Sequence, residues 1–130
     1  MHCYGIILAA GSGQRFGNDI PKQYLSVKAL PLLSYPLQCF LASNLFDGIF
    51  LVYNEAHSAL LNKIPQDLLA KIKLVKGGST RTESSQNALK EILNTAGNEA
   101  ILLFHDAARA NVYTDVIRSV KMALDTSQMA

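Results

Sequence analysis

A glycine-rich segment is the strongest candidate for chemistry in this sequence. It directly follows an apolar run and reads Leu8-Ala9-Ala10-Gly11-Ser12-Gly13-Gln14-Arg15-Phe16-Gly17. Small residues let the backbone approach a ligand closely, and successive inward N–H groups form a concavity suited to phosphate. The third glycine comes one residue too late for the dinucleotide fingerprint, and no lysine follows Gly13 or Gly17 as in a Walker loop. An ordinary strand-to-helix turn is the alternative.

Two basic residues accompany this segment. Arg15 lies inside it, and Lys22 follows in Pro21-Lys22-Gln23-Tyr24-Leu25. Cations beside an amide-rich turn can hold a triphosphate and neutralise charge that develops on a phosphorus under attack. Either cation alone would be a solvated surface charge. Together with the loop they favour phosphoryl or nucleotidyl transfer, with Arg15 and Lys22 as candidate catalytic residues.

A second turn of small residues, Lys76-Gly77-Gly78-Ser79-Thr80-Arg81-Thr82-Glu83-Ser84-Ser85, precedes a segment with helical spacing. The glycine pair permits backbone to lie against a flat ligand, and Ser84 offers a hydroxyl to a base edge. A turn with a helix N-cap also explains Ser84 and Glu83. Recognition of a base is therefore not derivable from this segment alone.

A third motif, His105-Asp106-Ala107-Ala108-Arg109, follows the apolar run Ile101–Phe104. Asp106 could accept a hydrogen bond from a ribose hydroxyl or help hold a magnesium ion that bridges phosphates. The alternative for Asp106 is a helix cap, which we rank below ligand contact. For His105 a packed core imidazole ranks above catalysis.

Four apolar runs indicate the strands that would position these motifs: Gly5–Ala10, Ile49–Tyr53, Ile72–Val75 and Ile101–Phe104. Their near-continuous hydrophobicity is typical of strands covered on both faces. Helical spacing lies between and after them, at Ser34–Leu45, Leu60–Ile64, Leu68–Ile72, Ala88–Leu93 and Val116–Leu124. The pattern predicts an α/β, doubly wound, mainly parallel sheet in one domain over residues 1–130.

The strand order decides where a ligand would lie. If the order is 3-2-1-4, the Gly11–Gly17 loop and Asp106 face each other across the crevice beyond the carboxyl ends of the first and fourth strands. Ile101–Phe104 would then lie at a sheet edge. That exposed edge leads us to expect a chain that is part of a longer one.

Charge and cysteine content limit the partners and the cellular compartment that this protein can have. The 130 residues carry a formal net charge of +2 with scattered basic residues, which does not argue for a nucleic-acid or membrane partner. Cys3 and Cys39 lack zinc-ligand spacing and lie in apolar stretches, so we expect buried free thiols in a reducing cytoplasm.

The three motifs, in order and spacing, closely resemble the 2-C-methyl-D-erythritol 4-phosphate cytidylyltransferase family over nearly the whole chain. The resemblance implies a Rossmann-like fold of the nucleotide-diphospho-sugar transferase type. It also implies Mg²⁺-dependent transfer of CMP from CTP to the polyol phosphate 2-C-methyl-D-erythritol 4-phosphate, releasing pyrophosphate, in the non-mevalonate route to isoprenoids. Arg15 and Lys22 would hold the triphosphate and stabilise the transition state. Gly78, Ser79 and Ser84 would surround cytosine. The residues lining base and ribose would be Ala9, Ala10, Gly11, Asp106 and Ala107, and Ser12 and Gly13 would complete the nucleotide-binding set.

The sequence departs from the family in two places. Ala110 stands where the family usually has proline. Family members also run on for roughly another hundred residues, which would supply a dimerisation arm, a second catalytic lysine and much of the acceptor pocket. The resemblance therefore implies an N-terminal, CTP-binding portion that is inactive alone, and a homodimer for the full-length form. A ribitol 5-phosphate cytidylyltransferase and a non-catalytic nucleotide-binding module are the alternatives.

Overall fold

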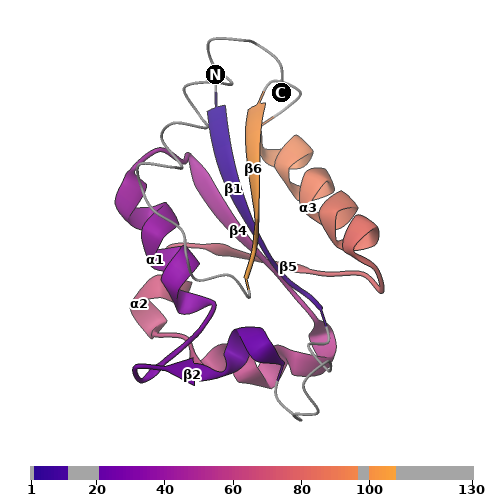
Figure 1. Ribbon diagram of the computed structural model, residues 1–130. Helices are drawn as coiled ribbons and strands as arrows, with labels where there is room; N and C mark the ends of the chain where they lie inside the picture. The colour runs from indigo at the N-terminus through magenta and orange to yellow at the C-terminus, as the bar shows by residue number, and fades with distance from the viewer. Residues whose placement is uncertain (1, 12–20, 97–99, 108–130) are drawn as a thin grey trace.

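The computed structural model describes residues 2–11, 21–96 and 100–107. A four-stranded parallel sheet, in the order β5-β4-β1-β6, forms the centre (Figure 1). This arrangement confirms the α/β class and the order 3-2-1-4 for the four apolar runs. The strands of this sheet are β1 (His2–Ala9), β4 (Gly48–Tyr53), β5 (Lys73–Lys76) and β6 (Ala100–Asp106). The other elements are η2 (Lys22–Tyr24), β2 (Ser26–Val27), β3 (Leu30–Pro31), α1 (Ser34–Ser43), η3 (Glu55–Lys63), α2 (Gln66–Leu69) and α3 (Arg81–Ala96).

Alternate residues of β1 point into two separate cores, one on each face of the sheet. Ile7 belongs to a core that includes Leu37 of α1. Ile6 belongs to a second core that includes Ile92 of α3. Figure 1 shows α1 and α2 on one side of the sheet and α3 on the other. The predicted doubly wound arrangement is therefore confirmed.

The carboxyl ends of the parallel strands meet at one edge of the sheet. Leu8 of β1 lies beside Val52 of β4 and beside Asp106 of β6. In doubly wound sheets, ligands bind beyond this edge, where the strand order reverses. The register therefore brings together the residues that follow the strands: Ala10, Asn54, Gly77 and Ala107.

The prediction that the third apolar run forms a strand covered on both faces is wrong. Its strand, β5, buries only Val75, and Leu74 is 46% exposed. Among the described residues β5 pairs with β4 alone, so it is an edge strand. At the opposite edge β6 pairs with β1, and Phe104 is 40% exposed. The prediction that the fourth run lies at a sheet edge therefore holds for the described part of the chain.

The predicted helices are largely confirmed. Pro36 lies in the first turn of α1, and the Ala88–Leu93 stripe lies on α3, although Leu93 is 51% exposed. The segment around Leu61 forms the 3-10 helix η3 instead of an α-helix. The Val116–Leu124 helix lies outside the described residues. Over the described ranges, no helix combines the length and apolar character that crossing a membrane requires.

The small antiparallel hairpin of β2 and β3 was not predicted. Its two turn residues, Lys28 and Ala29, have positive φ angles of 51° and 72°. Turns of this kind normally carry asparagine or glycine, which adopt positive φ at low cost. Their absence removes the usual sequence signal of a hairpin.

Candidate functional site

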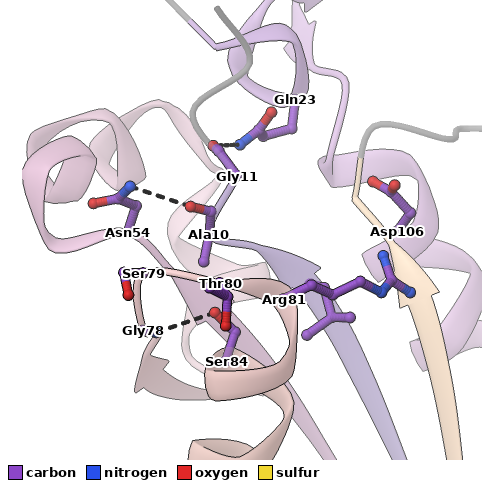
Figure 2. A pocket seen from close by; sticks show the side chains of 11 residues that line it. Ala10, Gly11, Gln23, Asn54, Gly78, Ser79, Thr80, Arg81, Ser84 and Asp106 are labelled. Atoms are coloured by element: carbon purple, nitrogen blue, oxygen red, sulfur yellow. Dashed lines mark hydrogen bonds between the residues drawn. The ribbon is translucent and has the colours of Figure 1, made fainter.

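A cavity of about 290 Å³ lies at the carboxyl edge of the sheet (Figure 2). It is bounded by the end of β1, by the residue after β4, by η2, by the turn before α3 and by the end of β6. The structure thereby brings parts of all three sequence motifs together. The predicted site residues that line the cavity are Ala10, Gly11, Gly78, Ser79, Ser84 and Asp106.

Side-chain amides hold the wall that follows β1. Gln23 Nε2 donates to the carbonyl oxygens of Ala9 (2.9 Å) and Gly11 (3.0 Å). Asn54 Nδ2 donates to the carbonyl oxygen of Ala10 (3.1 Å). Three successive carbonyls of the predicted phosphate-binding segment are thus engaged by side chains.

The turn before α3 forms the opposite wall. Gly78 N–H donates to Ser84 Oγ (3.1 Å), and Glu83 N–H donates to Thr80 Oγ1 (3.1 Å). Glu83 Oε2 accepts from both the N–H (2.8 Å) and the hydroxyl (2.9 Å) of Ser79. This turn is therefore built by its own side chains, and it places the positive end of α3 beside the cavity.

The interpretation of Ser84 as the helix N-cap is wrong. Helix α3 begins at Arg81, and Thr80 caps it, because its hydroxyl accepts from the N–H three residues on. Ser84 lies one turn into the helix and is buried. Its hydroxyl supports the Gly78 backbone at the cavity wall.

Gly77 has no room for a side chain. A Cβ atom there would lie 2.4 Å from the Ala10 Cβ and 2.8 Å from Ser84 Oγ. We expect Gly77→Ala to destabilise the fold by about 1–3 kcal/mol and to weaken ligand binding, because it forces the two walls apart. Chemical denaturation measures the first effect. The matched control is Gly11→Ala, since a Cβ at Gly11 meets nothing within 4 Å. Equal stability of the two variants would contradict this steric account.

The hydrogen bond from the Ser79 N–H, followed by that from the Ser79 hydroxyl, lowers the pKa of Glu83 below its ordinary value of 4.5. A lowered pKa means that the ionised carboxylate supports the turn at neutral pH. This support should persist down to about pH 4.5 and be lost as pH falls through the lower folded pKa.

The Glu83 carboxyl carbon resonance, followed against pH, tests this expectation. We expect its midpoint below 4.5, and Ser79→Ala should raise the midpoint only in part because the backbone donor remains. A midpoint at or above 4.5 would show that Ser79 does not hold the carboxylate.

The end of β6 closes the cavity. Asp106 is half-buried and lines it, as predicted. In Figure 2 the Arg81 side chain points toward this end of β6. Ala107 is buried and donates its N–H to the Leu8 carbonyl (2.9 Å), so it supports the edge without lining the cavity. The His105 ring lies 6.0 Å from that of Phe40, in agreement with a packed imidazole.

The remaining predicted residues lie beside the cavity or outside the described residues. Ala9 is buried at the end of β1. Lys22 is exposed at the start of η2 and is not among the lining residues. Ser12, Gly13 and Arg15 lie outside the described residues, as do Ala108, Arg109 and Ala110.

Besides the apolar Leu8, sequence reasoning missed four polar lining residues: Gln23, Asn54, Thr80 and Arg81. Three of them stand within the quoted motifs, where only their neighbours received roles. Asn54 carried a usable signal, because it is the first polar residue after a buried strand, at the edge where ligands bind.

The cavity can hold an anionic, hydrogen-bonding ligand. The Thr80 and Ser84 hydroxyls accept backbone hydrogen bonds and can still donate their own hydrogens to a ligand. The Arg81 guanidinium supplies further donors, whereas Asp106 supplies one carboxylate. No group of three or more His, Cys, Asp or Glu side chains that could hold a metal occurs among the described residues. One carboxylate fits a Mg²⁺ ion held mainly by ligand phosphates and water, and does not fit an all-protein metal cage.

Known proteins resemble this chain in sequence. A profile of the 2-C-methyl-D-erythritol 4-phosphate cytidylyltransferase (IspD) family matches residues 3–130. The 2-C-methyl-D-erythritol 4-phosphate cytidylyltransferase of Thermotoga neapolitana is 38% identical over 105 residues, which cover 80% of this chain and 46% of the relative. That of Cereibacter sphaeroides is 38% identical over 122 residues, covering 94% of this chain and 53% of the relative. The chain thus spans about half the length of these relatives.

Solved structures agree with the sequence comparison. The 4-diphosphocytidyl-2C-methyl-D-erythritol synthase of Anaerococcus prevotii superposes with a TM-score of 0.71 at 26% identity, covering 95% of this chain and 50% of that one. The bifunctional IspDF of Campylobacter jejuni gives a TM-score of 0.77 at 25% identity, covering 97% of this chain and 31% of that one. From the profile match, the relatives and the fold together, the chain belongs to the 2-C-methyl-D-erythritol 4-phosphate cytidylyltransferase family.

Proposed function

We propose that this chain binds CTP in the cavity at the carboxyl edge of the sheet. The protein would transfer CMP to 2-C-methyl-D-erythritol 4-phosphate and release pyrophosphate, in the non-mevalonate route to isoprenoid precursors. Family membership supports this reaction. The observation that carries the proposal is the convergence of the Ala10-Gly11, Gly78–Ser84 and Asp106 segments on one cavity.

Each wall would take a different part of the nucleotide. The N–H groups that follow β1 are suited to phosphate oxygens. Gly78, Ser79 and Ser84 would surround cytosine, because this turn combines close-lying backbone with fixed hydroxyls. Asp106 would accept from a ribose hydroxyl or join the shell of a phosphate-bound Mg²⁺ ion, which would neutralise charge on the triphosphate. Arg15 and Lys22 would hold the triphosphate, as the resemblance implies.

The cellular setting is part of the same proposal. The reducing cytoplasm is the proposed compartment, because Cys3 is buried, Cys39 is half-buried and the two form no disulfide. Homodimer formation by the full-length form stays a prediction.

Calorimetry with CTP, UTP, ATP and GTP tests the proposed ligand. We expect CTP to bind at least about tenfold more tightly than UTP, because a site built to hydrogen-bond one exocyclic group leaves polar atoms unpaired with another. Chelation of Mg²⁺ should weaken CTP binding. Equal affinity for all four nucleotides would remove cytosine selection from the proposed function.

A further inference from the structure

Two side-chain amides, those of Gln23 and Asn54, bind the three consecutive carbonyls of Ala9, Ala10 and Gly11. We call this pair the amide clamp. Gln23 is only 5% exposed, and its contact with the Ala9 carbonyl is fully buried. A buried glutamine whose donor reaches two main-chain carbonyls is costly to disturb, since its loss leaves those acceptors unpaired.

The clamp fixes the direction of backbone N–H groups as well as of carbonyls. In a planar trans peptide, the carbonyl of one residue and the N–H of the next point in opposite directions. Binding of the Ala9 carbonyl by Gln23 therefore directs the Ala10 N–H away from Gln23. Binding of the Ala10 carbonyl by Asn54 likewise directs the Gly11 N–H away from Asn54.

Both clamp residues are themselves anchored. Asn54 Oδ1 accepts from the Ala56 N–H (2.9 Å) at the start of η3, so the two ends of its amide are engaged in opposite senses. The Gln23 carbonyl accepts from the Leu33 N–H (2.9 Å), which ties η2 to the chain that enters α1. The clamp thus transmits the rigidity of two neighbouring elements to the end of β1.

We propose that Gln23 and Asn54 are positioning residues that hold the Ala10 and Gly11 N–H groups toward the phosphates of a bound nucleotide. Without the clamp, these peptides can rotate and present carbonyl oxygens, which repel an anion. This inference rests on the proposed function for the identity of the ligand. The clamp also has a consequence for Lys22. This residue precedes Gln23 in η2, so the hydrogen bonds of Gln23 tie it to the same end of β1.

Asn54→Asp is the sharpest test of the clamp. An aspartate keeps the oxygen that accepts from Ala56 and so keeps the cap of η3, whereas it loses the donor to Ala10. Gln23→Met removes the other donor without adding charge, which separates loss of the donor from repulsion of the ligand. Gln38→Met, at an exposed glutamine of α1 away from the cavity, is the matched control.

Two measurements on each variant separate positioning from folding. We expect both clamp variants to lose on the order of tenfold in CTP affinity, and to bind cytidine within about twofold of the unsubstituted chain. In the ligand-free protein, Asn54→Asp should shift the amide nitrogen resonance of Gly11, because that nitrogen shares a peptide with the Ala10 carbonyl. The control should change neither quantity.

The outcomes distinguish the clamp from the proposed function. CTP affinity unchanged in both clamp variants, or an equal loss for CTP and cytidine, would overturn the positioning role. If the unsubstituted chain binds no CTP, the proposed function fails, and an unmoved Gly11 resonance in Asn54→Asp would then overturn the clamp itself. Should Gln23→Met fail to fold, Asn54→Ser takes its place at the half-buried Asn54 site, because it keeps an oxygen to cap η3 but lacks the amide donor to Ala10 and adds no charge.

Discussion

Replacing Lys22 by alanine should lower kcat/KM for CMP transfer at least about a hundredfold, the cost of one transition-state electrostatic contact worth roughly 3 kcal/mol. Lys22 opens η2 and directly precedes Gln23 in the cavity wall. The buried Pro21, with φ of −57°, sets the direction in which the chain enters Lys22. The lysine therefore lies next to the cavity wall, on the side that we propose takes the phosphates, where negative charge would develop during transfer.

A suitable assay joins this chain to the C-terminal portion of the Thermotoga neapolitana relative and measures pyrophosphate release. Lys63→Ala is the matched control, because Lys63 is an exposed lysine at the end of η3 that does not line the cavity. If Lys22→Ala reduces kcat/KM by less than about tenfold, Lys22 is an ordinary surface lysine.

The second prediction concerns the catalytic activity of the 130-residue chain by itself. A polypeptide of these 130 residues should bind CTP and release no pyrophosphate above background with methylerythritol phosphate and Mg²⁺. Transfer requires the acceptor phosphate in line with the α-phosphorus, and such positioning supplies roughly 7–11 kcal/mol of a barrier, or about five to eight powers of ten in rate. We propose that the cavity holds the nucleotide alone, and the relatives named for this reaction are about twice as long.

The relevant comparison is with the Thermotoga neapolitana relative at equal concentration. Far-UV circular dichroism of the 130-residue polypeptide establishes first that it is folded. Turnover within about tenfold of the relative would show that this chain positions an acceptor by itself, and would place the acceptor site among its own residues.

The central sheet was predictable because its buried strands are visible in the sequence as apolar runs. Strands β1 and β4 are buried on both faces and read as unbroken apolar runs, which the sequence displays directly. Helix α3 was equally clear from its stripe around Ala88. The hairpin around Lys28 was not predictable, since its two turn residues at positive φ are ordinary residues and not the glycine or asparagine that signals such a turn. The exposure of Leu74 could not be predicted either, because a run of apolar residues does not reveal whether its strand is central or at an edge.

The motifs predicted the location of the site, but not all of the side chains that build its walls. Ala10, Gly11, Gly78 and Asp106 converge as expected, because register brings the ends of parallel strands to one edge. Gln23 and Asn54 were not predicted as site residues, because a side chain that binds backbone carbonyls leaves no characteristic spacing in the sequence. The alternative reading of Ser84 as a helix cap is wrong, since Thr80 and Ser84 are both plausible caps until the helix start is known.

The most direct test of the central claim is where CTP binds. A titration of the chain with CTP and Mg²⁺, followed through backbone amide resonances, reports every contacted segment at once. We predict that the largest shifts fall on Ala10, Gly11, Gly78, Ser79 and Asp106, which line one cavity although they are far apart in the sequence. Shifts confined to the β2–β3 hairpin or the outer surface of α1, with these five resonances unmoved, would contradict the proposed nucleotide site.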